Sequence, residues 1–245
     1  MLATRGNRIT WLGHSTVQIL TASGQLLLID PWVTGNPSFP ESMTNFPRVD
    51  LILTTHGHSD HTGDVISLAN RHNAPVVALY ELAQWFGSKG VTSVLPMGKG
   101  GTQKIGDLSV TMVHAIHSSS VEDGGNLLYA GEPAGLVLRL PGNFTVYHAG
   151  DTTVFGDMKI IGELYQPDLA CLPIGDRFTM GPREAAYAIR LLGVKHVLPI
   201  HYGTFPLLTG TPDALRELTR DIAGLEIHAL KPGESLGETE RVAGA

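Results

Sequence analysis

The chain contains the stretch Thr54-Thr55-His56-Gly57-His58-Ser59-Asp60-His61, which directly follows the apolar run 51–53. Four of these residues carry side chains that bind metals, and they lie within six positions. In a strand that ends in a turn, His56 and His58 would point to the same side, while Asp60 and His61 would face a second point nearby. Imidazole and carboxylate groups together suit zinc, manganese or iron. The stretch therefore predicts a cage for divalent transition metals rather than a solvated polar loop.

The composition favours a globular protein whose metal site contains no thiolate. The 245 residues, of which 42% are hydrophobic, can form a sizeable core, and no linker is visible, so we expect a single domain over residues 1–245. A structural zinc site normally uses several cysteines. The chain has one, Cys171, which lies in an apolar run and is predicted to be buried in the core.

Charge and hydropathy argue against nucleic acid and membrane partners. The formal net charge is −6, and the sequence has no Lys/Arg-rich run. Residues 1–8 lack the apolar segment of a signal peptide, and no window approaches the ~18 apolar residues of a membrane span. We therefore expect a cytoplasmic protein with a small-molecule substrate. The oligomeric state stays open, and a homo-oligomer is compatible with the sequence.

Apolar runs and turn residues predict strands early in the chain, then alternating helices and strands. The expected strands cover residues 8–12, 17–21, 26–29, 75–78, 108–115, 136–140, 144–147, 169–173, 196–200 and 225–230. The expected helices cover residues 65–71, 81–86, 182–192 and 212–222. Two long loops are expected at 31–48 and 122–135. This order favours an α/β fold of two sheets packed face to face with helices outside.

Three further polar residues, His117, Asp151 and His201, each follow a strand-like apolar run where the strand becomes a loop. Loops at one edge of a sheet sandwich can converge, so these residues could join the stretch 54–61. The combined set has five histidines and two aspartates. Two metal ions with about four to five ligands each, sharing one carboxylate and one water, would use all seven residues.

The stretch 56–61 has the His-x-His-x-Asp-His form, and with Asp151 and the late His201 it closely resembles the metallo-β-lactamase superfamily. Other motifs are similar to a branch of metal-dependent hydrolases that is related to ascorbate-phosphate lactonases and N-acyl phospholipase D enzymes. These motifs are Gly13-His14, Leu28-Ile29-Asp30-Pro31, His148-Ala149-Gly150-Asp151-Thr152, Phe178-Thr179-Met180-Gly181 and Pro199-Ile200-His201-Tyr202-Gly203-Thr204. The resemblance covers residues 8–230 and implies an αββα sandwich of two mixed sheets.

The resemblance also implies how the seven residues divide between two metal ions. The implied ligands are His56, His58 and His117 for one ion, Asp60, His61 and His201 for the other, and Asp151 as the bridge between them. His114 is an alternative to His117, but it lies within the predicted strand rather than at its end.

Other polar residues are expected to support the ligands. Asp30 matches a family motif that mostly supports the site. His14 either contacts the substrate or is a hydrogen-bonded structural residue, and both alternatives stay open. His148 is expected behind the ligands or buried on its strand. The residues without a partner pattern, which are expected at the surface or in packing, are His72, His196 and His228.

Together these features predict a hydrolase that uses a hydroxide activated by two metal ions on an ester, lactone or phosphodiester bond. The ions are expected to be zinc, with manganese or iron as alternatives. Asp60 would orient the nucleophile and pass on its proton, and His14 would stabilise the developing oxyanion. The site keeps positive charge after its ligands are counted, which favours a small anionic substrate. The alternatives are a non-catalytic metal-binding or sensing protein and a nuclease of the same superfamily.

The two predicted loops could wall a pocket over the metal ions. The first carries Trp32, Phe39 and Phe46, which could cover the site or pack on the body of the protein. The second follows His117 and is rich in glycine. Such walls would limit the site to compact molecules rather than polymers.

Overall fold

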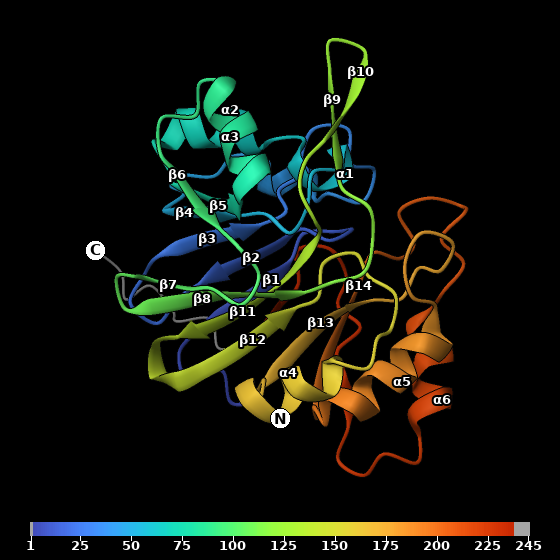
Figure 1. Cartoon of the computed structure of the whole chain (residues 1–245). Coiled ribbons are helices and arrows are strands. Elements are labelled where there is room, and N and C mark those ends of the chain that lie inside the picture. The colour runs from blue at the N-terminus through green and yellow to red at the C-terminus, as the bar shows by residue number, and fades with distance from the viewer. Residues whose placement is uncertain (1, 238–245) are drawn as a thin grey trace.

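The computed structural model describes residues 2–237, which form two seven-stranded mixed sheets packed face to face (Figure 1). The first sheet has the order β16 (Ser235–Leu236), β1 (Arg8–Trp11), β2 (Val17–Leu20), β3 (Leu26–Ile29), β4 (Leu51–Leu53), β5 (Val76–Leu79), β6 (Val94–Met97). The second has the order β15 (Glu226–Ile227), β14 (His196–Ile200), β13 (Leu169–Pro173), β12 (Phe144–His148), β11 (Ala134–Leu140), β8 (Leu108–His114), β7 (Thr102–Ile105).

Helices cover the outer face of each sheet, as Figure 1 shows. On the first sheet these are α2 (Val65–His72) and α3 (Tyr80–Ser88), and on the second they are α4 (Met158–Tyr165), α5 (Pro182–Leu192) and α6 (Pro212–Thr219). The four-residue helix α1 (Ser59–Thr62) lies apart from α2 and α3 in Figure 1. Two short 3-10 helices are η1 (Glu41–Met43) and η2 (Pro141–Asn143). The predicted αββα sandwich is confirmed. None of the helices within residues 2–237 has the length and hydropathy of a membrane-spanning segment.

The central strands are buried on both faces, so alternate residues belong to different hydrophobic clusters. In β3, Leu27 and Ile29 face the cluster between the sheets, whereas Leu28 packs in the cluster beneath α2 and α3. In β13, Cys171 faces the cluster between the sheets, and Leu172 packs beneath α4 and α5. The prediction of a buried cysteine is confirmed.

The predicted loop 122–135 is wrong in its first part. A hairpin forms there from β9 (Ser120–Asp123) and β10 (Asn126–Tyr129), joined by Gly124 and Gly125, which both have positive φ. All four residues of β10 are exposed, so the alternation of apolar and polar residues that marks a half-buried strand is missing there. The hairpin stands beside α1 in Figure 1.

Other differences from the sequence-based prediction concern short elements, mostly at sheet edges. The predicted strand 225–230 shrinks to the two residues of β15, and the helix predicted over 212–222 ends at Thr219. Strands β6, β7 and β16 and helices α1 and α4 were not predicted. In β6, Pro96 interrupts the apolar pattern, and parallel pairing with β5 holds the strand instead.

Gly57 lies where the loop after β4 meets the base of the hairpin. Its amide donates a hydrogen bond to Oγ of Ser119 at 3.1 Å. A Cβ at this position would lie 2.7 Å from Cβ of Ala130 and 2.9 Å from the carbonyl oxygen of Ser120. Only glycine permits this approach, which holds the stretch 54–61 against the segment that carries His117.

We expect Gly57→Ala to lower the free energy of unfolding by about 1–3 kcal/mol, because the added methyl group overlaps its neighbours. Gly156→Ala is the matched control, since a Cβ at Gly156 meets nothing within 4 Å. The control should change stability by less than about 0.5 kcal/mol. Urea unfolding of both variants, followed by circular dichroism in the presence of a chelator, measures the difference. Equal stability would contradict the close packing at Gly57.

Candidate metal centre

The predicted ligands come from loops that follow four strands. Strand β4 is followed by His56 and His58, β8 by His117, β12 by Asp151 and β14 by His201. The remaining two ligands lie on the short helix α1. Because β4 belongs to the first sheet and the other three strands to the second, the cluster forms where the edges of the two sheets meet.

His56, His58 and His117 form one compact group, in which the facing nitrogens all lie within 4.8 Å of one another. Nε2 of His56 is 3.0 Å from Nδ1 of His58. The hydroxyl of Thr55 donates to Asp30 at 2.6 Å, so it accepts a hydrogen bond from Nδ1 of His56 at 3.0 Å. Nε2 of a neutral His56 therefore keeps its lone pair toward the group.

Asp60, His61 and His201 form a second group, with His14 beside them. Nε2 of His61 and Nε2 of His201 each lie 3.9 Å from Oδ2 of Asp60. Nδ1 of His61 donates to Oδ2 of Asp30 at 2.8 Å. This bond leaves Nε2 of a neutral His61 as the unprotonated atom, as in carboxylate–histidine–metal triads.

The carboxylate of Asp151 lies between the two groups. Its Oδ1 is 3.3 Å from Nε2 of His61, and its Oδ2 is 3.1 Å from Nε2 of His201. The same Oδ2 lies 3.6 Å from Nε2 of His117 and 4.0 Å from Nε2 of His56. One carboxylate thus faces ligand atoms of both groups.

Three buried atoms at this point lack a hydrogen-bond partner among the described residues. They are Nε2 of His61, Nε2 of His201 and Oδ1 of Asp151. A buried polar atom without a partner costs about 1–3 kcal/mol. Binding of a cation would satisfy all three atoms, so the donor set fits divalent metal ions.

The backbone around the cluster is strained. His14, Asp30 and His201 have φ values of 51°, 47° and 52°, in the left-handed region that favours glycine. The amide of His201 donates to the carbonyl of His14 at 2.8 Å, which links two of the strained residues. Strained backbone of this kind is common at functional sites, where contacts with the surrounding structure stabilise it.

Comparison with known proteins agrees with this geometry. The profile described as a beta-lactamase superfamily domain matches residues 26–202, which include all seven predicted ligands. A UPF0173 metal-dependent hydrolase from Koribacter versatilis (strain Ellin345) is 50% identical over 231 residues, or 94% of this chain and 98% of the relative. This chain belongs to the UPF0173 metal-dependent hydrolases of the metallo-β-lactamase superfamily.

Other relatives match over nearly their full length. A UPF0173 metal-dependent hydrolase from Rubrobacter xylanophilus is 51% identical over 234 residues, or 95% of this chain and 97% of the relative. Igni18, a metallo hydrolase from Ignicoccus hospitalis, has a solved structure that superposes on this one with a TM-score of 0.83. The two sequences are 32% identical, and the match covers 96% of this chain and 99% of the Igni18 chain. The metallo-β-lactamase fold protein YhfI from Bacillus subtilis, at 16% identity and a TM-score of 0.70, shares the fold over 94% of this chain and 98% of its own.

The charges of this metal-dependent hydrolase favour a cation at the centre. Burial opposes a charge on His61, but Asp151, Asp30 and Asp60 outweigh it and hold the pKa of this imidazole well above its usual value. Burial likewise opposes a charge on Asp151, but His201 and His61 outweigh it and hold the pKa of the carboxyl well below its usual range. The carboxylates therefore favour a positive charge at this point, which is either the proton on His61 or a metal ion.

The histidines of the other group are held neutral. Burial lowers the pKa of His56 well below its usual value and also lowers the pKa values of His58 and His117. A neutral imidazole is the form that binds a metal ion. These three side chains are therefore ready to act as ligands without first losing a proton.

Both ring nitrogens of His14 form hydrogen bonds within the protein. Burial lowers its pKa to about 4, so the ring is neutral at pH 7. Nε2 donates to Oδ2 of Asp60 at 3.0 Å, and Nδ1 accepts from the hydroxyl of Thr204 at 2.9 Å. Of the two alternatives left open by the sequence, this geometry favours the hydrogen-bonded structural residue.

The centre opens to solvent on one side. The side chains of Asp60 and His117 are 30% and 16% exposed, whereas His61 and Asp151 are 0% and 3% exposed. A structural metal site is normally closed by protein ligands, and a catalytic site keeps an accessible position. Asp60 and His117 therefore lie on the side of the centre that solvent reaches.

The structure separates the cluster from histidines that the sequence left uncertain. His114, the alternative to His117, is exposed and accepts a hydrogen bond from Nζ of Lys99 at 3.1 Å. His148 is buried, and its Nε2 donates to the carbonyl of Ser15 at 3.0 Å.

The aromatic residues of the loop 31–48 divide between two roles. Phe39 and Phe46 pack against each other in the cluster beneath α2 and α3, so they do not roof the centre. Trp32 lies edge-on to His14, with ring centroids 5.2 Å apart. Sequence reasoning missed Phe205, which also contacts His14 and Trp32, because it follows the last ligand loop and has no motif of its own.

We expect metal binding to release about one proton near pH 7, because His61 must lose the proton that the three carboxylates favour. The apparent metal affinity should therefore rise with pH above 6.5, through the raised pKa of His61, and fall as the pH drops. Calorimetric zinc titrations in buffers of different ionisation enthalpy count the released protons. The Asp30→Asn variant should release fewer. A metal affinity that is independent of pH between about 6.5 and 8 would contradict this account of His61.

Proposed function

We propose that this protein hydrolyses an ester, lactone or phosphodiester bond in a small anionic molecule, using water activated between two divalent metal ions. The observation that carries this proposal is the position of Asp151, whose carboxylate lies within 4.0 Å of nitrogens in both histidine groups. A shared carboxylate would hold two ions close enough to act on one substrate bond.

The proposed ligands are His56, His58 and His117 for one ion, Asp60, His61 and His201 for the other, and Asp151 for both. When bound, the ions lower the pKa of water and polarise the carbonyl or phosphoryl oxygen under attack. Imidazole and carboxylate donors favour zinc, with manganese or iron as alternatives.

Asp60 is the ligand proposed to orient the attacking water. It lies on the open side of the centre, with 30% of its side chain exposed. Burial alone would raise the pKa of its carboxyl group, but His61 and the hydrogen bond from His14 outweigh burial and lower it. Asp60 therefore stays a carboxylate that accepts a hydrogen bond from water. His14, held in turn by Thr204, acts as a positioning residue for Asp60.

The charge balance of the centre supports an anionic substrate. Two divalent ions would carry four positive charges, whereas the carboxylates of Asp30, Asp60 and Asp151 return three. The chain as a whole has a formal net charge of −6, but solvent ions screen the repulsion between distant surface carboxylates and an anionic substrate. The attraction between the metal ions and that substrate acts over a few ångströms in a partly buried site, and it outweighs this repulsion. A phosphate or carboxylate beside the scissile bond would therefore strengthen binding.

We expect the purified protein to hold two transition-metal ions per chain, and Asp151→Ala to weaken metal binding by about 10-fold to 100-fold or more, because it removes the bridging ligand. Asp107→Ala is the control, since Asp107 is exposed and outside the cluster. Metal analysis after dialysis against graded chelator measures both variants. If Asp151→Ala kept two ions and full activity, the bridging role would be wrong.

We expect faster hydrolysis of an anionic ester than of a neutral ester of the same size, because the metal centre attracts the anion. Steady-state rates at low and high salt, with zinc, manganese and iron tested separately, measure this preference for the anionic ester.

Asp60→Asn should reduce the rate of hydrolysis by about 10²-fold to 10⁴-fold while the variant stays folded.

Three outcomes would overturn parts of the proposal. A preference for the neutral ester at low salt would remove the argument from charge. Efficient cleavage of long nucleic acid would favour a nuclease. Absence of turnover on ester, lactone and phosphodiester substrates by the metal-loaded protein would favour a metal-binding or sensing role.

A further inference from the structure

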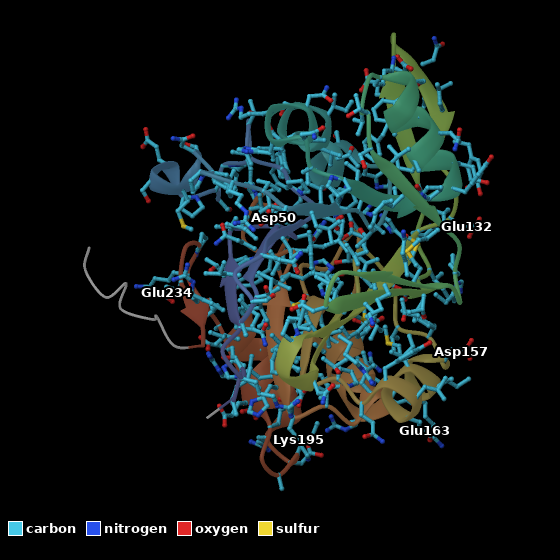
Figure 2. All side chains as sticks on the ribbon, turned by 90° about the vertical axis from the view of Figure 1, so that its left-hand side faces the viewer. Asp50, Glu132, Asp157, Glu163, Lys195 and Glu234 are labelled. Carbon is cyan, nitrogen blue, oxygen red and sulfur yellow. The ribbon has the colours of Figure 1, made fainter. Side chains whose placement is uncertain are left out.

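A second group of metal-binding side chains lies at the opposite end of β14 from the metal centre. His196 is the first residue of this strand, and His201 directly follows its last residue. Five steps at about 3.3 Å each separate the two by roughly 16 Å. Lys195, the neighbour of His196, lies at the lower edge of the molecule in Figure 2. The two groups therefore cannot share an ion.

The second group is assembled by the pairing of β14 with β15. The parallel register places His196 opposite Glu226, and the amide of His228 donates to the carbonyl of Val197 at 2.8 Å. Nδ1 of His196 then lies 3.2 Å from Nε2 of His228 and 3.9 Å from Oε2 of Glu226. These three ligand atoms all lie within 4.8 Å of one another.

The nitrogen spacing fits a shared metal ion. Two nitrogens bound to one tetrahedral zinc ion, at about 2.0–2.1 Å each, lie roughly 3.3 Å apart. His56 and His58 in the metal centre show a similar spacing, at 3.0 Å against 3.2 Å. Both imidazoles of the second group are partly buried, and burial lowers the pKa of His228, which favours its neutral form as a ligand.

We propose that His196, Glu226 and His228 bind one further divalent transition-metal ion, such as zinc, at the edge of the second sheet. Two imidazoles and one carboxylate supply three ligands, and water completes the tetrahedron. The ion would join β14 to β15, which is only two residues long and has two residue pairs in register. Because the ligands come together only in the folded chain, binding would stabilise this edge of the sheet.

The sequence alone gave no sign of this group. His196 and His228 are separated by 32 positions and belong to no motif. Only the parallel pairing of β14 with β15 brings them together.

Titration of zinc into the holoprotein, after its metal centre has been filled and excess metal removed, tests the proposal. We expect one additional bound ion per chain and a rise in the thermal unfolding midpoint. The double variant His196→Asn/His228→Asn should lose both effects and keep the ions of the metal centre. His72→Asn, which replaces a histidine on α2, should behave as the unchanged protein.

Glu226→Gln provides a milder test, because Glu226 is exposed and its replacement keeps the shape of the side chain. Its zinc affinity at the additional site should fall by roughly tenfold or more. Magnesium should not replace zinc, since imidazole is a poor ligand for magnesium. The proposal is overturned if the holoprotein takes up no additional zinc, or if the double variant binds it as tightly as the unchanged protein. Separate counting of the ions in the metal centre distinguishes these results from a failure of the proposed function.

Discussion

The metal centre depends on the carboxylate of Asp30, which is fully buried. This carboxylate sets the orientation of one histidine in each ligand group of the centre, namely His56 and His61. Oδ1 accepts a hydrogen bond from the amide of Thr55, and Oδ2 accepts from the hydroxyl of Thr55 and from Nδ1 of His61. Through Thr55 it also fixes His56. A buried charge requires such bonds, and here they leave the opposite nitrogen of both imidazoles facing the centre.

The position of Asp30 depends in turn on parallel pairing. Strand β3 pairs in parallel with β4, so Asp30 and the stretch 54–61 leave the first sheet at the same edge. Strands β12, β13 and β14 are also parallel, which brings Asp151 and His201 to one edge of the second sheet. The carboxyl ends of parallel strands are a common place for ligand sites in α/β proteins. Face-to-face packing of the two sheets then completes the centre.

The layers of the fold were predictable because burial on both faces leaves a plain signal in the sequence. Strands such as β3 and β13 are continuous apolar runs, and α5 begins with a proline and ends before Gly193 in the left-handed conformation. The hairpin β9–β10 and the extent of β15 were not predictable, since neither is set by local burial. Exposed Leu127 and Tyr129 carry no periodic pattern, and β15 ends where its pairing with β14 ends.

The sequence by itself determined the family and the candidate ligands, because His56, His58, Asp60 and His61 lie within one short stretch and the remaining ligands follow apolar runs. The tertiary structure decided how those ligands are supported. His14 is joined to Thr204 across 190 positions and to Asp60 across 46, so its role follows from packing rather than from any motif. The local pattern of apolar and polar residues indicates which side of a strand or helix is buried. Contacts between distant loops depend on sheet register and on the packing of one sheet against the other, and only the folded chain fixes these.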